Sequence, residues 1–339
     1  VDFSIPLCNG TSGLYSAYAC LDLKPGDEII CPSYTYWATA MPAVTFSVKI
    51  VFAEIDPITL CIDPDDVKKK ITPKTKAIVP VHIWGMHAEM DRIMEIEKEK
   101  DIAVIEDASH AHGAESKGKK VGGIGDIGVF SFQGTKLMPA GEGGIFLTNN
   151  EEYFEKALAL GHYERVKTPF VSPTSQYLKY ATTTSMGMKF RMSPLHAAIA
   201  LAYLETLDED NKLRNAYCEK FRAVIRTLPG FDAFETPKHI KRVFYEHHIQ
   251  YDETVRKISN KQMAETLQAE GVSLSAQRYR LIHQQPYFQE KGYLKDLLPI
   301  TDRSVGMQFR VPNFSVKSDE LLRSEERRVG KDCRSRWSP

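Results

Sequence analysis

The amino-acid sequence predicts an α/β fold: a mostly parallel sheet of seven strands with helices on both faces, followed by a smaller C-terminal α+β domain. Two observations lead to this class. Through about the first 200 residues, short apolar runs alternate with amphipathic helical stretches, which is typical of a parallel sheet buried on both faces. From Pro194 the pattern becomes long and helical, and a shorter strand and helix follow it.

Each strand of the sheet is predicted from a short apolar run bounded by polar or turn-forming residues. Between the strands, amphipathic stretches predict helices at Gly13–Leu23, Pro64–Ile71 and Met90–Lys100. The expected strands are Phe3–Leu7, Glu28–Cys31, Lys49–Ala53, Ala77–Val81, Ala103–Ile105, Gly128–Phe132 and Gly144–Leu147.

The last third of the chain predicts a second domain. A long helix runs from Pro194 to about Phe221, and the tract "RVFYEHHIQYD" predicts a strand. The tract "SNKQMAETLQAEGV" predicts a helix that ends at Gly271. We therefore expect a large domain over residues 1–205 and a small domain over residues 206–322.

The two ends of the sequence differ from the rest. The chain starts without Met inside a predicted strand, and "RSEERRVGKDCRSRWSP" breaks in composition from everything before it. We interpret residues 323–339 as the translation of a sequencing adapter, and we expect both natural ends to be missing. A basic tail for an acidic partner is the alternative interpretation.

The composition argues against several classes of protein. Lys plus Arg and Asp plus Glu number 44 each, so no basic field indicates a nucleic-acid partner. No apolar run reaches membrane-spanning length, so we expect no membrane partner. The six cysteines form no C-x-x-C pair, which favours a cytoplasmic protein with reduced thiols.

Polar and aromatic side chains follow the first two predicted strands. "NGTSGL" places Thr11 and Ser12 at the start of a helix, where N–H groups and hydroxyls can bind a phosphate; an ordinary helix cap is the alternative. "PSYTYWATA" places Tyr34, Tyr36 and Trp37 after the second strand. These rings can offer a flat face to a planar ligand, or they can belong to the core.

A carboxylate and a lysine follow two later strands. "EDASHAHGA" places Glu106 and Asp107 at a strand end, followed by His110 and His112. The spacing of the two histidines does not suit one face of a helix, so we predict no metal site. Lys136 follows the sixth strand, where a surface lysine is the alternative interpretation.

One cofactor would use all of these features. Pyridoxal 5'-phosphate forms a Schiff base with a lysine, and its ring nitrogen needs an anionic partner to stay protonated. Its ring needs a stacking partner, and its phosphate needs N–H and hydroxyl donors. "GIGDIG", residues 123–128, fits a dinucleotide-binding pattern, but it neither follows a strand nor opens a helix. We interpret it as a loop that leads into the strand after it.

Eight motifs stand in an order that resembles the DegT/StrS-type sugar aminotransferases, over roughly residues 3–322. These are pyridoxal-phosphate enzymes with the fold of aspartate aminotransferase, called fold type I. The motifs are "NGTSGL", "LKPGDEIICPSYTYWAT", "FAEIDPITLCID", "VPVHIWGMHAEMD", "VIEDASHAHGA", "GDIGVFSFQGTK", "GEGGIFLTN" and "GMKFRMSPLHAAIA".

The resemblance implies a role for each matching residue. It makes Lys136 the Schiff-base lysine and Asp107 the partner of the ring nitrogen, and these two are the expected catalytic residues. It also implies a homodimer, in which Lys189 reaches the cofactor of the partner subunit. Lys189 departs from the family, since many members have asparagine there. The other implied cofactor-binding residues are Thr11, Ser12, Tyr36, His110 and Ser131.

The implied activity is transfer of an amino group from glutamate or glutamine to a keto sugar, nucleotide-linked, or to a keto-inositol. A sugar dehydratase of the same fold is one alternative, although such members replace the lysine with histidine. A non-catalytic regulatory protein that binds the cofactor is a second alternative. The intact pair of Lys136 and Asp107 favours the aminotransferase.

Overall fold

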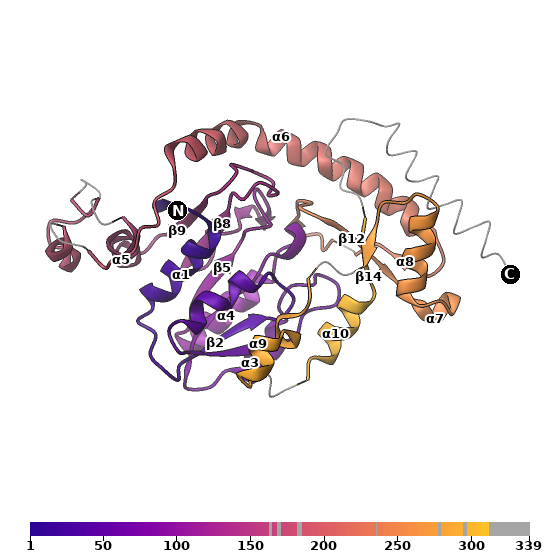
Figure 1. Cartoon of the computed structure of the whole chain (residues 1–339), viewed down its shortest axis with the longest axis horizontal. Coiled ribbons are helices and arrows are strands. Elements are labelled where there is room, and N and C mark those ends of the chain that lie inside the picture. The colour runs from indigo at the N-terminus through magenta and orange to yellow at the C-terminus, as the bar shows by residue number, and fades with distance from the viewer. Residues whose placement is uncertain are drawn as a thin grey trace.

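A seven-stranded sheet forms the centre of the computed structural model of the protein (Figure 1). The structure describes residues 1–162, 165–167, 171–181, 185–234, 236–276, 279–293 and 297–311. The segment 323–339 and the expected domain end at residue 322 lie outside these residues. The strands are β1 (Phe3–Leu7), β2 (Glu28–Pro32), β3 (Lys49–Ala53), β4 (Thr75–Ile78), β5 (Ala103–Asp107), β8 (Ile127–Ser131) and β9 (Gly144–Thr148).

The strands lie in the order β1-β9-β8-β5-β4-β2-β3. Strands β8, β5, β4, β2 and β3 pair in parallel, whereas β9 is antiparallel to both β8 and β1. The expected mostly parallel sheet of seven strands is therefore confirmed. As a consequence, every strand except β9 ends at the same edge of the sheet, and β9 begins there.

Helices cover both faces of the sheet. Neighbouring residues of a strand point to opposite faces, so each strand contributes apolar side chains to the cores on both sides. Ile29 packs in one apolar core with Leu14 of α1, whereas Ile30 packs in the other with Val67 of α3 and Ile93 of α4. This explains why the strands are continuous apolar runs. The helices of this part are α1 (Gly10–Cys20), α2 (Met41–Val44), α3 (Pro64–Lys70), α4 (Met90–Lys100) and α5 (Glu151–Gly161).

Several boundaries differ from the sequence-based expectation, and two of them have a clear structural cause. Helix α1 starts three residues earlier than expected, because Asn9 caps it: the Asn9 side chain accepts from the Ser12 N–H at 2.8 Å. Strand β4 ends at Ile78 and not at Val81. Pro80 has no N–H to donate to a neighbouring strand, so the regular ladder stops before it.

The C-terminal part is built around a four-stranded sheet with its own apolar core. The long helix α6 (Pro194–Ile225) spans the upper side of the molecule in Figure 1 and reaches this second core, where Cys218 and Phe221 are buried. The sheet has the order β10-β12-β14-β13. Its strands and helices are β10 (Phe231–Asp232), β12 (His247–Tyr251), β13 (Ser275–Ala276), β14 (Gln308–Val311), α7 (Glu253–Arg256) and α8 (Asn260–Ala269).

Between β13 and β14 the chain returns to the large sheet. Ile282, Phe288 and Leu298 belong to the same apolar core as helix α1. The division at residue 205 therefore stays a prediction. The remaining elements are β6 (Glu115–Ser116), β7 (Lys119–Lys120), β11 (Ile240–Lys241), α9 (Pro286–Glu290), α10 (Pro299–Gly306) and the short 3₁₀ helices η1 (Trp37–Thr39), η2 (Ile83–Gly85), η3 (Gln176–Tyr180) and η4 (Ile282–Gln284).

Within the described residues, none of the helices combines the length and the apolar character that crossing a membrane requires.

Candidate active site

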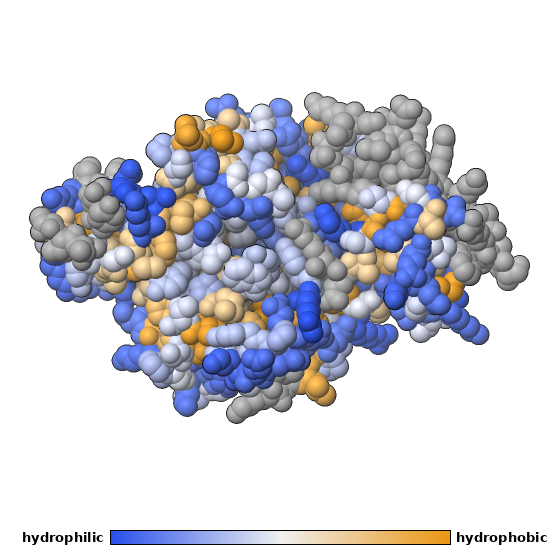
Figure 2. Space-filling view, viewed as in Figure 1, coloured by the Kyte–Doolittle hydropathy of each residue, from blue (hydrophilic) through white to orange (hydrophobic). Residues whose placement is uncertain are grey.

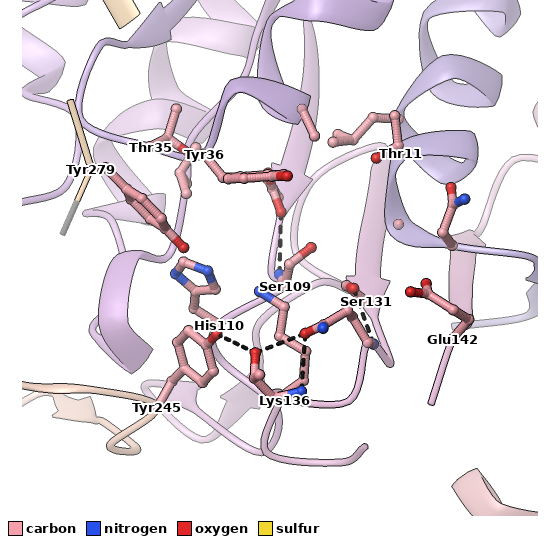
Figure 3. A pocket seen from close by; sticks show the side chains of 18 residues that line it. Thr11, Thr35, Tyr36, Ser109, His110, Ser131, Lys136, Glu142, Tyr245 and Tyr279 are labelled. Carbon is pink, nitrogen blue, oxygen red and sulfur yellow. Dashed lines mark hydrogen bonds between the residues drawn. The ribbon is translucent and has the colours of Figure 1, made fainter. Parts of the chain in front are cut away.

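A cavity of about 450 Å³ opens at the sheet edge where the parallel strands end (Figure 3). Residues at or after the ends of β1, β2, β4, β5 and β8 line it, together with Glu142, just before β9, and two residues from the C-terminal part. This is the edge at which open α/β sheets bind ligands. The lining includes Asn9, Gly10, Thr11, Thr35, Tyr36, Asp107, Ser109, His110, Ser131, Gln133, Thr135, Lys136, Glu142, Tyr245 and Tyr279.

The first turn of α1 forms one end of the cavity. The N–H groups of Gly10 and Thr11 have no acceptor within the helix, because they lie in its first turn. A Cβ at Gly10 would come within 2.9 Å of the Cβ of Ser131, so glycine allows the helix to approach β8 this closely. N–H groups and the hydroxyls of Thr11 and Ser131 therefore converge on a place that suits a phosphate.

Asp107 is buried at the end of β5, and its two carboxylate oxygens have different partners. Oδ2 accepts a hydrogen bond from the Thr39 hydroxyl at 2.7 Å, and Oδ1 accepts one from the Ser109 N–H at 3.2 Å. The carboxylate thus has a fixed orientation while it lines the cavity.

The neighbouring Glu106 faces away from the cavity and holds the "GIGDIG" segment. Its carboxylate is fully buried and accepts hydrogen bonds from the N–H groups of Gly122, Ile124 and Gly125 and from His82 Nε2, at 2.7–2.9 Å. Burial by itself would raise the pKa of Glu106, but the hydrogen bonds from His82 and from the loop outweigh it and lower the pKa. Glu106 therefore fixes the loop that leads into β8. The segment begins as a loop, as predicted from the sequence.

Lys136 lies on the loop between β8 and β9 and is half-buried. Its Nζ is 4.6 Å from the ring centroid of Tyr245, and Figure 3 shows the side chain between Tyr245 and Ser131. The Thr135 hydroxyl donates to Gln133 Oε1 at 2.7 Å, so the Tyr245 hydroxyl donates to Thr135 at 3.1 Å. The loop and the C-terminal part therefore meet at the lysine.

A stack of rings lies on the side of the cavity away from Thr11, and His110, Tyr245 and Tyr279 of this stack line the cavity (Figure 3). The indole of Trp84 lies 5.0 Å from His110, 4.9 Å from Tyr279 and 4.5 Å from His248, each nearly parallel. His110 also stacks on Tyr245 at 4.4 Å. Trp84 itself has a φ of 55°, which is unusual for a bulky residue and persists only when the surroundings hold it.

His112 does not line the cavity and lies behind its wall. Burial, together with the nearby charge of Lys136, lowers its pKa to about 3. The imidazole is therefore neutral at physiological pH. In the part of the chain that the structure describes, no group of three His, Cys, Asp or Glu side chains could hold a metal ion.

The structure brings most of the expected site residues together. Tyr36 lines the cavity, whereas Trp37 does not. Ser12 is also outside the lining, since its hydroxyl donates to the Asn9 carbonyl at 2.7 Å within the helix cap. Lys189 is exposed beside the end of α5 and does not line the cavity of its own chain. Its expected contact with a partner subunit stays a prediction.

Several lining residues were not anticipated from the sequence: Thr35, Ser109, Glu142, Tyr245 and Tyr279. Thr35 stands inside "PSYTYWAT", where the aromatic residues drew attention instead. Tyr245 and Tyr279 come from segments more than a hundred residues after Lys136, and no local pattern marks them.

Comparison with known proteins identifies the family. A model of the DegT/DnrJ/EryC1/StrS aminotransferase family matches residues 1–323. The chain belongs to this family. Among curated members, it is 31% identical over 314 residues to the "Pleiotropic regulatory protein" of Geobacillus stearothermophilus, covering 92% of this chain and 80% of that protein.

A second relative, from Streptomyces kanamyceticus, is provisionally named L-glutamine:3-amino-2,3-dideoxy-scyllo-inosose aminotransferase. It is 33% identical over 290 residues, which is 84% of this chain and 67% of that protein. A solved structure described as DesI in the presence of its TDP-sugar product is 28% identical with a TM-score of 0.82, covering 99% of this chain and 81% of that one. An aminotransferase from Psychrobacter cryohalolentis shares the fold with a TM-score of 0.88 at 24% identity, over 97% and 87% of the two chains.

Proposed function

We propose that this member of the family is a pyridoxal-phosphate-dependent aminotransferase, with Lys136 and Asp107 as its catalytic residues. The observation that carries the proposal is the arrangement of one cavity. It combines a lysine, a buried carboxylate held in a fixed orientation, and a helix N-terminus opposite a serine.

The residues of the cavity fit this cofactor. The first turn of α1, Thr11 and Ser131 would hold its phosphate, at the place where Gly10 lets the helix come close to β8. The carboxylate of Asp107 would hold the proton of the ring nitrogen. Tyr36 and His110 also line the cavity and would offer flat faces to its ring. Pyridoxal phosphate, when bound, supplies an electron sink for the bonds at the amino-bearing carbon.

The chain itself supplies the proton transfers and the positioning. The amine Nζ of Lys136 would serve as general base and general acid: it would take a proton from the amino-bearing carbon of the donor and deliver it to the cofactor carbon that keeps the amino group. The Tyr245 ring and its bond to Thr135 position this amine, and the buried rings behind His110 limit the access of water. Glutamate or glutamine is the proposed donor.

We further propose a keto-inositol or a nucleotide-linked keto sugar as the acceptor. The named activity of the Streptomyces kanamyceticus relative supports the first class, and the TDP-sugar product with DesI supports the second. A coupled assay that offers both classes with either donor distinguishes them by the amine that accumulates.

The decisive experiment is an absorbance spectrum of the purified protein with pyridoxal phosphate, before and after glutamate or glutamine is added. We expect a visible band that the donor bleaches, and no such band with Lys136→Ala. The control is Lys119→Ala, which removes an exposed lysine outside the cavity. A folded wild-type protein without the band would refute the proposal.

A non-catalytic regulatory protein is the second candidate, because the Geobacillus stearothermophilus relative is named as a regulator. Such a protein would also show the visible band. The two candidates differ in turnover: a regulator would not release more than one equivalent of aminated product per subunit.

We also propose a homodimer. Figure 2 shows apolar surface over the N-terminal part of α6, where Leu195, Leu201 and Leu204 are exposed. We expect Leu201→Glu to raise the fraction of monomer in sedimentation velocity, whereas Lys212→Glu, farther along the same helix, should not. Equal sedimentation of both variants and the wild type would contradict this contact.

A further inference from the structure

A buried hydroxyl pair lies behind the carboxylate of Asp107. Thr39 is completely buried, and its Oγ1 lies 2.8 Å from Thr35 Oγ1 and 2.7 Å from Asp107 Oδ2. Thr35 in turn lines the cavity. The three side chains therefore form a continuous chain of polar groups from the cavity, through the protein, to the back of the carboxylate.

Counting protons fixes the direction of these bonds. A carboxylate oxygen can only accept, so the single hydroxyl proton of Thr39 points to Asp107. The oxygen of Thr39 must then accept the proton of Thr35. Both hydroxyl dipoles thus point to the same carboxylate oxygen, which stabilises its negative charge more than one isolated bond would.

Thr39 is itself held rigidly. Its carbonyl oxygen accepts a bond from the buried Tyr18 hydroxyl at 2.5 Å, and its N–H donates to the Tyr36 carbonyl at 3.1 Å. Burial raises the pKa of Tyr18 well above its ordinary value, so this hydroxyl keeps its proton and remains a donor. A β-branched side chain with both backbone groups bonded has little freedom to turn its hydroxyl away from Asp107.

We propose that Thr39 is a positioning residue with two effects. It orients the Asp107 carboxylate so that Oδ1 faces the ring nitrogen of the cofactor. Its hydroxyl also limits how strongly Asp107 draws the proton from that nitrogen. This inference rests on the proposed function. Oδ2 accepts a short bond from Thr39 at 2.7 Å, whereas the Ser109 N–H reaches Oδ1 only at 3.2 Å, so Oδ1 is the oxygen with the weaker partner.

Three variants separate the hydroxyl from the shape of the side chain. Thr39→Val keeps the shape and removes the hydroxyl, Thr39→Ser keeps the hydroxyl and removes a methyl group, and Thr39→Ala removes both. The comparison of Thr39→Ala with Thr39→Ser isolates the hydroxyl even if Thr39→Val does not fold. Each protein is studied with pyridoxal phosphate bound.

The first readout is the pH at which the visible band of the bound cofactor changes. We expect this transition to move to higher pH in Thr39→Val and Thr39→Ala. Without the Thr39 hydroxyl, Asp107 draws the proton of the ring nitrogen more strongly, so less positive charge remains on the ring.

The second readout is the rate of bleaching by glutamate or glutamine. We expect a roughly ten- to hundredfold lower maximal rate, as for loss of one hydrogen bond to a charged group, with little change in the donor concentration at half-maximal rate. Thr39→Ser should resemble the wild type in both.

Two outcomes would overturn the inference alone: wild-type spectra and rates in Thr39→Val, or equal impairment of Thr39→Ser and Thr39→Ala. Either would mean that the hydroxyl pair only fills and satisfies the core. A wild-type protein that forms no visible band would overturn the proposed function itself, and this inference with it.

Discussion

Replacing Glu106 with Gln tests whether a buried carboxylate holds the loop beneath the active site. The Glu106 oxygens accept two bonds each: Oε1 from Ile124 and Gly125, and Oε2 from Gly122 and His82. An amide keeps one acceptor oxygen and turns N–H groups toward the other two donors. Whichever way the amide faces, two buried donors lose their acceptor.

His82 cannot relieve this conflict by changing its tautomer. Its Nδ1 accepts a bond from the Ala88 N–H at 3.2 Å, so Nε2 carries the proton that points to Glu106. A hydrogen bond to a charged group contributes about 1.5–3 kcal/mol, so two lost bonds cost about 3–6 kcal/mol of unfolding free energy. That is a large share of the about 5–15 kcal/mol that stabilises a typical protein.

Urea unfolding at neutral pH measures this loss, and amide hydrogen exchange at Gly122, Ile124 and Gly125 locates it. The control is Glu95→Gln on the exposed side of α4, which should change the free energy by less than about 0.5 kcal/mol. A loss below about 1 kcal/mol in Glu106→Gln, with unchanged exchange in the loop, would refute the reasoning.

The same variant has a defined pH dependence. The folded-state pKa of Glu106 lies below its ordinary value of 4.5, so the carboxylate contributes its full stabilisation above that pH. This contribution is lost as the pH falls through the lower folded pKa. The difference between wild type and Glu106→Gln should therefore be largest near neutral pH and shrink in acid.

Two further predictions concern close packing and thiol chemistry. Gly85→Ala should lower the free energy of urea unfolding by more than about 2 kcal/mol, because a Cβ at this position with positive φ would lie 2.1 Å from the Val243 carbonyl oxygen. Gly118→Ala, which has a similar φ and open space around it, measures the conformational cost alone, and an equal loss in both would contradict the role of the contact. Iodoacetamide should modify half-buried Cys8 in the native protein well before Cys61, because burial raises the pKa of Cys61 to about 12. Peptide mass mapping that finds both modified at equal rates would count against this accessibility.

The sequence predicted the sheet well because both faces of each strand are buried, and this produces apolar runs that need no knowledge of their partners. It also predicted where Asp107 and Lys136 would meet, since strand ends in such a sheet gather at one edge. Local pattern was less reliable at single positions. Thr11 and Ser12 are neighbours on one helix turn, but only Thr11 lines the cavity, whereas Ser12 completes the helix cap.

Residues that distant packing brings to the site left no signal of their own. Tyr245 stands in a tract predicted as one strand, yet it precedes β12, and its ring reaches Lys136 because the C-terminal part packs against the loop after β8. Thr39 was missed for a different reason: its role depends on a hydrogen bond to Asp107, 68 positions away in the chain.

The pairing of β1 with β9 determines the order in which the site can be assembled. Phe3 pairs with Thr148, and Ser131 reaches the start of α1 only when β9 stands between β1 and β8. Translation must therefore pass Thr148 before this end of the cavity can form. Tyr245 and Tyr279 arrive later still, and contacts this distant in sequence form slowly. Binding of the proposed cofactor should thus be a late event in the biogenesis of this protein, and we expect nascent chains that stop before β9 not to bind it.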